Sequence, residues 1–175
     1  MVDIREASLP ADRDAVGRLW LAYLRWGNEE MQARHGFHLP VEEAVEHDLA
    51  TISAFQPPDG HILLAFDGDE AFGIGCLRRI RSDTAEIKRM YVDPARRRGG
   101  VGRALLQGLL GIADDDGYRT VWLDSPDFMT AAHGMYRSAG FTDIAPYAES
   151  EIPDEIKSYW VFMGLSLPAP AGPAA

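Results

Sequence analysis

The sequence contains a single cysteine, Cys76, among its 175 residues. One thiol cannot form an internal disulfide, and no CxxC pair or Cys/His cluster suggests a zinc site or another metal centre. Long apolar runs are also missing, because no stretch approaches the roughly 18 residues of a membrane span. The first residues, MVDIREASLPADRD, show no apolar segment behind a basic one, so no secretory signal is expected. These absences predict a cytoplasmic protein with no metal, no disulfide and no membrane partner.

Basic residues are few relative to acidic ones, with 17 Lys+Arg against 27 Asp+Glu and a net charge of −10. This balance argues against nucleic acid as a partner, unless basic side chains are concentrated locally. The 46% of hydrophobic and 25% of charged residues are typical of a globular chain with a real core. We expect a single domain over residues 1–166 and a disordered Pro/Ala-rich tail over residues 167–175.

Hydrophobic periodicity predicts an α+β fold. Apolar residues recur at helical spacing in four segments, which are 16–27, 40–52, 101–117 and 129–139. Alternating or short apolar runs predict seven strands, at 2–6, 61–67, 71–81, 85–92, 120–124, 141–144 and 159–165. Polar, irregular composition indicates loops over 28–39 and 146–156. The predicted order is β-α-α-β-β-β-α-β-α-β-β, in which an antiparallel meander over 61–92 feeds a mixed sheet.

A basic, glycine-rich segment joins the meander to the next helix. It is YVDPARRRGGVGR over residues 91–103, with glycines at 99, 100 and 102. Glycines leave backbone N–H groups uncovered, and the first N–H groups of a helix have no intrahelical partner. The helix dipole favours an anion at the same end. The segment therefore predicts a cradle for phosphate or pyrophosphate.

The local charge agrees with an anion site. Residues 88–103 carry one acid and six basic side chains, a local charge of +5 that leaves −15 elsewhere; the basic residues are Lys88, Arg89, Arg96, Arg97, Arg98 and Arg103. A solvated loop is the alternative for the arginines. No Lys-Ser/Thr pair of a Walker A loop is present, and Leu105 follows where a dinucleotide fingerprint needs a third glycine. Asp124 suits a ribose contact, so a nucleotide site stays open, although only about 50 residues follow it.

Two motifs resemble those of the GCN5-related N-acetyltransferase (GNAT) family. The run Arg97-Arg98-Gly99-Gly100-Val101-Gly102 is similar to its acyl-CoA-binding signature, Gln/Arg-x-x-Gly-x-Gly/Ala. The run AHGMYRSAGF, over residues 132–141, is similar to its second block, Ala-x-x-x-Tyr-x-x-x-Gly-Phe. The motifs stand in the expected order and are joined by the expected helix and strand. The resemblance implies an α/β sandwich whose mostly antiparallel central sheet is flanked by helices, and an acetyltransferase that uses acetyl-CoA and no metal.

The resemblance also implies which residues hold coenzyme A. Its pyrophosphate is expected on the amides of the glycine loop and helix start, and its pantetheine and acetyl group along the preceding strand. The expected cofactor-binding residues are Met90, Tyr91, Val92, Arg97, Arg98, Gly99, Gly100, Val101, Gly102 and Arg103. In the family this strand splays from its neighbour, commonly through a β-bulge that no sequence pattern identifies here.

The implied reaction is direct transfer of an acetyl group from acetyl-CoA to a primary amine in a ternary complex. Tyr136 matches the family's usual acid, and a phenol with a pKa of about 10 suits a thiolate leaving group. Glu86 is the expected base, because some family members place a catalytic glutamate four residues before the Met90 position. Strand alternation puts Glu86, Lys88 and Met90 on one face. Cys76 is not needed as a nucleophile, since proximity in a ternary complex does the main work.

Each of these roles has a structural alternative. Tyr136 also fits a core tyrosine whose hydroxyl bonds a backbone carbonyl, and Glu86 fits a cross-strand ion pair with Arg79 or Arg81. His133, one helical turn before Tyr136, fits a packed or solvent-facing histidine. The alternative function is a non-catalytic acyl-CoA-binding or regulatory module of the same fold.

Acidic and aromatic residues indicate the chemical class of the acceptor. In the family, the acceptor meets the first helices and the loop before the last strand. Residues 1–60 hold eleven acids and residues 149–155 hold four more. Five aromatic residues are interleaved with them, namely Trp20, Tyr23, Trp26, Phe37 and Tyr147. Carboxylates beside aromatic faces suit a cation, so we expect a small basic amine or a lysine-like group. Acids that only keep the surface soluble are the alternative. The family often forms homodimers, but no segment here identifies an interface.

Overall fold

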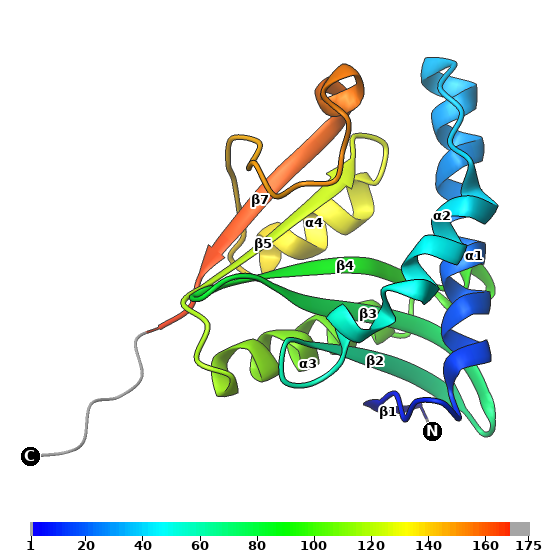
Figure 1. Cartoon of the computed structure of the whole chain (residues 1–175), viewed down its shortest axis with the longest axis vertical. Helices are drawn as coiled ribbons and strands as arrows, with labels where there is room; N and C mark the ends of the chain where they lie inside the picture. Colours follow the sequence, from blue (N-terminus) through cyan, green and yellow to red (C-terminus); the bar gives the residue numbers. More distant parts are fainter. Residues whose placement is uncertain (1, 169–175) are drawn as a thin grey trace, which may run out of the picture.

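A seven-stranded sheet runs through the molecule in the order β1-β2-β3-β4-β5-β7-β6 (Figure 1). The structure is a computed structural model that describes residues 2–168. Only the β4–β5 pair is parallel among these strands. The strands are β1 (Asp3–Glu6), β2 (Gly60–Asp67), β3 (Glu70–Arg81), β4 (Thr84–Val92), β5 (Thr120–Pro126), β6 (Thr142–Asp143) and β7 (Trp160–Ser166). The predicted element order and the mostly antiparallel sheet are confirmed.

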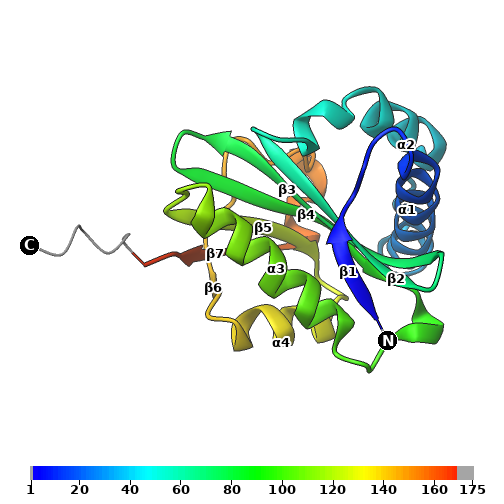
Figure 2. The same cartoon turned by 90° about the horizontal axis from the view of Figure 1, so that it is seen from below.

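Helices cover both faces of the sheet (Figure 2). Two lie on one face, α1 (Arg13–His35) and α2 (Val41–Ala50), and two on the other, α3 (Val101–Asp115) and α4 (Thr130–Ser138). Three short 3-10 helices complete the described residues, namely η1 (Ile52–Phe55), η2 (Pro94–Arg96) and η3 (Asp154–Tyr159). No helix within residues 2–168 combines the length and the apolar character needed to cross a bilayer. Of the tail predicted over 167–175, residues 169–175 lie outside the described residues.

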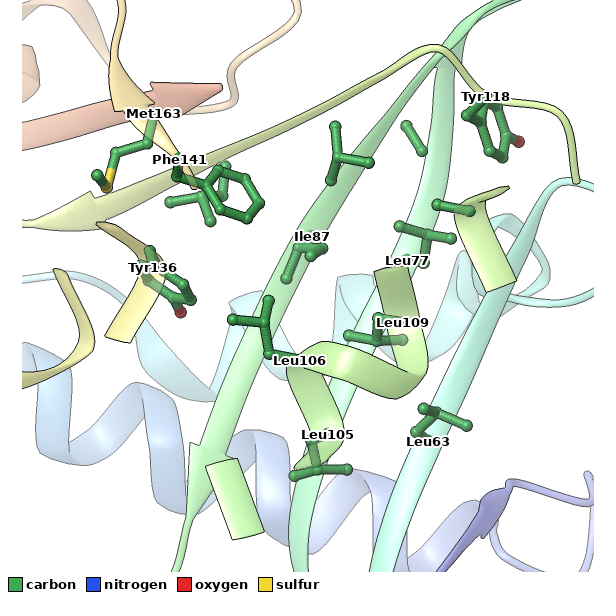
Figure 3. Close-up of a cluster of buried hydrophobic side chains, with 14 of the residues drawn as sticks. Leu63, Leu77, Ile87, Leu105, Leu106, Leu109, Tyr118, Tyr136, Phe141 and Met163 are labelled. Carbon is green, nitrogen blue, oxygen red and sulfur yellow. The ribbon is translucent and has the colours of Figure 1, made fainter. Parts of the chain in front are cut away.

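Each face of the sheet has its own apolar core. On the α3 side, three leucines of α3 form one buried cluster with Ile87 of β4, namely Leu105, Leu106 and Leu109 (Figure 3). On the α1 side, Trp20 packs with Cys76 of β3. Full burial of a leucine-sized side chain contributes about 1.5–3 kcal/mol, so these two cores hold β3 and β4 firmly in the middle of the fold.

The first helix is longer than predicted. It does not end at Gly27 but continues to His35 and stops at Gly36, whose φ of 68° is the left-handed conformation that glycine adopts readily. Residues 28–35, predicted as a loop, are therefore helical. Tertiary contacts explain the difference, because Met31 is buried and the Asn28 side chain accepts a 2.7 Å hydrogen bond from the Leu39 amide.

The chain after α4 also departs from the prediction. The strand expected over 141–144 is only the two residues of β6, and the loop expected over 146–156 ends in the 3-10 helix η3. Tyr159, expected to begin the last strand, closes that helix instead. Boundaries of such short elements depend on neighbouring segments more than on local periodicity.

Candidate active site

A bulge in β4 changes the direction of its side chains. The register against β3 shifts between Ile74 and Cys76, and Arg89 has a φ of 54°. Lys88 pairs with Cys76 on the α1 side, whereas Met90 packs into the core on the α3 side. The prediction that Glu86, Lys88 and Met90 share a face is therefore wrong, because the extra residue moves the alternation by one position.

Met90 rests against a glycine on the neighbouring strand. A Cβ atom on Gly75 of β3 would lie 2.6 Å from the Met90 Sδ atom and 2.9 Å from a methyl carbon of Leu109. Both distances are too short for real contacts, so the present packing needs a residue without a side chain at position 75.

The strands β4 and β5 pair over only part of their length. The parallel ladder joins residues 84–87 to residues 120–123, after which β4 continues to Val92 and β5 to Pro126 without pairing to each other. Figure 1 shows the two strands diverging beyond this ladder. Backbone groups of β4 beyond Ile87 are consequently not paired with β5. This is the divergence that the resemblance implies.

Two open cavities follow this part of β4. The first, of about 400 Å³, lies between β4 and α4 and is called the β4 cavity; the second, of about 420 Å³, borders the glycine segment and is called the loop cavity. Nine of the ten predicted cofactor-binding residues line at least one of them; Gly99 does not. The nine are Met90, Tyr91, Val92, Arg97, Arg98, Gly100, Val101, Gly102 and Arg103.

The loop cavity borders the start of α3. Gly100 precedes the helix with a φ of 76°, no side chain caps the helix, and the first intrahelical bond runs from the Ala104 amide to the Gly100 carbonyl at 2.9 Å. The N–H groups of residues 101–103 thus have no intrahelical acceptor. Together with the helix dipole, they form a site for an anion.

The six basic residues of segment 88–103 are divided between different surroundings. Lys88 and Arg89 lie on the other side of β4, and Arg96 pairs with Asp67 away from the cavities. The remaining three line the loop cavity and have no carboxylate within 4.0 Å among residues 2–168; they are Arg97, Arg98 and Arg103. The anion site is thus flanked by three arginines rather than six basic residues.

Tyr136 extends from α4 to the point where β4 and β5 diverge. It lines the β4 cavity and also a slot of about 30 Å³ between the two strands. Its ring contacts Phe141, with centroids 5.9 Å apart, and lies in the cluster of Figure 3. Within residues 2–168 its hydroxyl forms no hydrogen bond, so it is not the carbonyl-bonded core tyrosine considered above. Burial raises the pKa of this phenol above its usual range, which keeps it protonated as a donor.

Glu86 is enclosed in the protein. The side chain is 0% exposed, accepts a 2.7 Å hydrogen bond from the Arg78 Nε atom and a 2.6 Å one from the Tyr147 hydroxyl, and lines none of the cavities described here. Its cross-strand partner is Arg78, directly opposite in the register, rather than Arg79 or Arg81. The role of Glu86 as the base stays a prediction.

A further cavity, of about 310 Å³, lies on the other side of the diverging strands, against α1, α2 and the segment before β7. We call it the α1–α2 cavity. Fifteen acids, eleven in residues 1–60 and four in residues 149–155, are expected from the sequence to form the acceptor surface. Of these, only Glu151 lines the cavity. Asp124, at the end of β5, lines both this cavity and the slot, and Met129 lines these two and the β4 cavity. The cavities on the two sides of the sheet therefore meet at the slot.

Asp124 is the residue of this site that sequence reasoning missed, because it entered only as a ribose contact of a rival nucleotide site. The signal was an acid placed directly after the apolar run Val121–Leu123. His133 and Cys76 are both buried. His133 contacts the Ser125 hydroxyl at 3.1 Å, which fits the packed alternative, and burial raises the pKa of the Cys76 thiol to about 12.

A splayed parallel pair of strands beside an uncapped, glycine-bordered helix start defines a fold with known relatives. The sequence model of the Acetyltransferase (GNAT) family matches residues 19–141. The chain belongs to this family.

Two curated relatives span most of the chain. An uncharacterized N-acetyltransferase of Schizosaccharomyces pombe is 28% identical over 159 residues, which are 89% of this chain and 91% of the relative. The IAA acetyltransferase of Azospirillum brasilense is 31% identical over 123 residues, 68% of this chain and 76% of the relative.

Solved structures share the fold. A GNAT-family acetyltransferase of Staphylococcus aureus superposes with a TM-score of 0.74 at 17% identity, covering 96% of this chain and 100% of the other. The PaiA N-acetyltransferase of Thermoplasma acidophilum, solved in complex with coenzyme A, has a TM-score of 0.72 at 17% identity and covers 95% and 99% of the two chains.

Proposed function

We propose that the protein transfers an acetyl group from acetyl-CoA to a primary amine, which is a small basic amine or a lysine-like group, by direct attack in a ternary complex. The observation that carries this proposal is the meeting of the β4 cavity and the α1–α2 cavity at the slot between β4 and β5. Tyr136 borders the slot from one side and Asp124 from the other. Two ligands that enter from opposite sides of the sheet would therefore meet beside a proton donor.

The residues on the donor side fit coenzyme A. Its phosphates would be held by the free amides at the start of α3 and by the three arginines that have no carboxylate partner, while its pantetheine would lie along the edge of β4 that is not paired with β5. Gly102 supports this fit, because it lines both cavities and its missing side chain leaves the helix start open to close approach. Bound acetyl-CoA would supply an activated acyl group as a thioester.

Attack by the amine nitrogen on the thioester carbon breaks the carbon–sulfur bond. Tyr136 is proposed to protonate the departing sulfur, supported by its position at the slot and its free hydroxyl. In place of the predicted role of Glu86 as the base, we propose that Glu86 is a positioning residue, because its two oxygens already hold Arg78 and the Tyr147 hydroxyl. Tyr147 in turn lies 3.4 Å from Asp124, so Glu86 would fix the wall of the acceptor side.

Calorimetry and a turnover assay test the proposal together. Acetyl-CoA and CoA are expected to bind while NAD does not, and a panel of primary amines with acetyl-CoA is expected to release the CoA thiol. Binding of NAD without CoA would refute the reading. Binding of acetyl-CoA with no thiol release for any amine would favour the non-catalytic module.

A further inference from the structure

The wall between β4 and the segment before η3 holds three carboxylates and two cations. Arg78 bonds Glu86 at 2.7 Å and Glu151 at 2.6 Å, and Lys88 bonds Glu151 at 2.6 Å. Asp124, the third carboxylate, has no basic side chain within 4.0 Å among residues 2–168. The cluster therefore lacks one positive charge, and the deficit lies at Asp124.

Asp124 keeps one oxygen free. Its Oδ2 atom accepts a 3.0 Å hydrogen bond from the Ser150 hydroxyl and lies 3.4 Å from the Tyr147 hydroxyl, which is 2.6 Å from Glu86. Its Oδ1 atom accepts no hydrogen bond from the described residues. The slot that Asp124 and Tyr136 both border has about 30 Å³, more than the roughly 10–15 Å³ that one water needs, so an amino group fits there.

The α1–α2 cavity leading to Asp124 is largely apolar. Side chains from α1, α2, the segment between them, η3 and β7 form its walls, including Leu24, Met31, Leu39, Val41, Ile156 and Trp160. Its volume of about 310 Å³ is at the lower end of ligand pockets, which range over roughly 300–1,000 Å³. A small molecule therefore fits it better than a bulky one.

The other charged groups of this cavity already have partners. Lys88 pairs with Glu151, and Arg89 bonds Asp48 at 2.5 Å, so no uncommitted cation is left for a carboxylate on the acceptor. The Asn28 side chain is used by its bond to the Leu39 amide. A second ammonium group on the acceptor would likewise find no unpaired carboxylate in the wall.

We propose that the acceptor is a small primary monoamine on an apolar body, and that Asp124 binds its ammonium group at the slot and removes a proton from it. This inference rests on the proposed function, because it names the substrate class and the proton acceptor of the same site. Asp124 is then a catalytic residue, and the α1–α2 cavity is the site for the apolar body.

The proton balance closes. The ammonium nitrogen gives its first proton to Asp124, which passes it to water, and the lone pair so freed attacks the thioester carbon. The carbon–sulfur bond breaks as the sulfur takes the Tyr136 proton. The second proton lost by the nitrogen restores Tyr136, so the products are an amide, the CoA thiol and one proton in solution.

Electrostatics support this assignment. Burial raises the pKa of Asp124, and Lys88 only partly opposes that effect. A carboxylate in such surroundings gains from an arriving cation, and the apolar cavity lowers the pKa of the bound ammonium. Both effects bring donor and acceptor pKa values closer together, which eases proton transfer.

Asp124→Asn tests the residue, because it removes the charge and keeps the shape. We expect kcat/KM for the amine to fall about 100-fold while the affinity for acetyl-CoA, measured by calorimetry, stays unchanged. Asp143→Asn is the matched control: the same chemical change at an exposed acid that pairs with Arg137 at 2.9 Å and lines none of the four cavities described above. Retention of wild-type kcat/KM by Asp124→Asn would overturn the assignment.

A substrate panel tests the class. Hexylamine and phenethylamine are expected to have kcat/KM values at least 10-fold above those of spermidine, free lysine and a lysine-containing peptide. Preference for spermidine or for the peptide would overturn the inference while leaving the proposed acetyl transfer intact.

Binding separates failure of the inference from failure of the proposed function. Hexylamine is expected to bind the CoA-loaded protein by calorimetry, and Asp124→Asn is expected to abolish this binding. Binding of hexylamine without thiol release would reject the proposed function and retain the amine site. Thiol release with other amines, without any binding of hexylamine, would reject the amine site alone.

Discussion

Two glycines of α3, Gly102 and Gly111, allow ligand access at the start of the helix to be tested separately from the stability of the helix. Gly102 lines both the β4 cavity and the loop cavity, and a Cβ atom there would lie 3.6 Å from the Met135 Sδ atom, an ordinary contact. Gly111, in the same helix, is exposed and has nothing within 4 Å of an added Cβ atom. Alanine is accommodated at both positions, and each substitution should stabilise the helix by about 0.5–1 kcal/mol.

Only the methyl group at position 102 would stand where a phosphate must approach. If it displaces one charged hydrogen bond, worth about 1.5–3 kcal/mol, the dissociation constant for CoA should rise roughly 10- to 150-fold. For both Gly102→Ala and Gly111→Ala, calorimetry with CoA measures the change in affinity, and thermal unfolding measures the change in stability. Equal CoA affinity in the two variants, both folded, would refute the placement of the phosphates at the start of α3.

Three further outcomes are expected. Tyr136→Phe should lower kcat about 100-fold at unchanged acetyl-CoA affinity and melting temperature, because its hydroxyl has no partner in the described residues; unchanged turnover under chemistry-limited conditions would remove it from the mechanism. Burial opposes ionisation of Glu151, but Lys88 and Arg78 outweigh this and lower its pKa to about 2. Its ion pairs therefore stabilise the fold above pH 4.5 and lose that effect as the pH falls toward 2. Since Glu151 is half exposed, Glu151→Gln should cost about 1 kcal/mol at pH 7 by urea unfolding, with the difference vanishing at low pH. Cys76, with a pKa raised to about 12 by burial, should resist iodoacetamide in the folded protein without loss of activity.

Much of the donor side follows from sequence alone. The glycines at 99, 100 and 102 and the apolar periodicity of the next helix are local signals, and an anion cradle depends mostly on local backbone. Hence nine of the ten residues predicted there line the two cavities beside β4.

The acceptor side depends on contacts that no local pattern encodes. The bulge at Arg89 moved Met90 to the other face from Glu86, and strict alternation contains no signal for one extra residue. Asp124 became part of the site only because β5 turns away from β4 after Leu123. The acids of the first 60 residues looked like an acceptor surface in the sequence, yet neither α1 nor α2 contributes an acid to the lining of the cavity.

Gly75 borders none of the cavities, yet it affects their shape through its contact with Met90. An alanine there would push against the Met90 thioether, and this side chain forms a wall of both the β4 cavity and the slot. The space available to an acyl group is therefore set in part from β3, behind the strand on which the acyl group would lie. Selectivity for acyl-chain length would then be a property of a pair of positions, 75 and 90, that must change together.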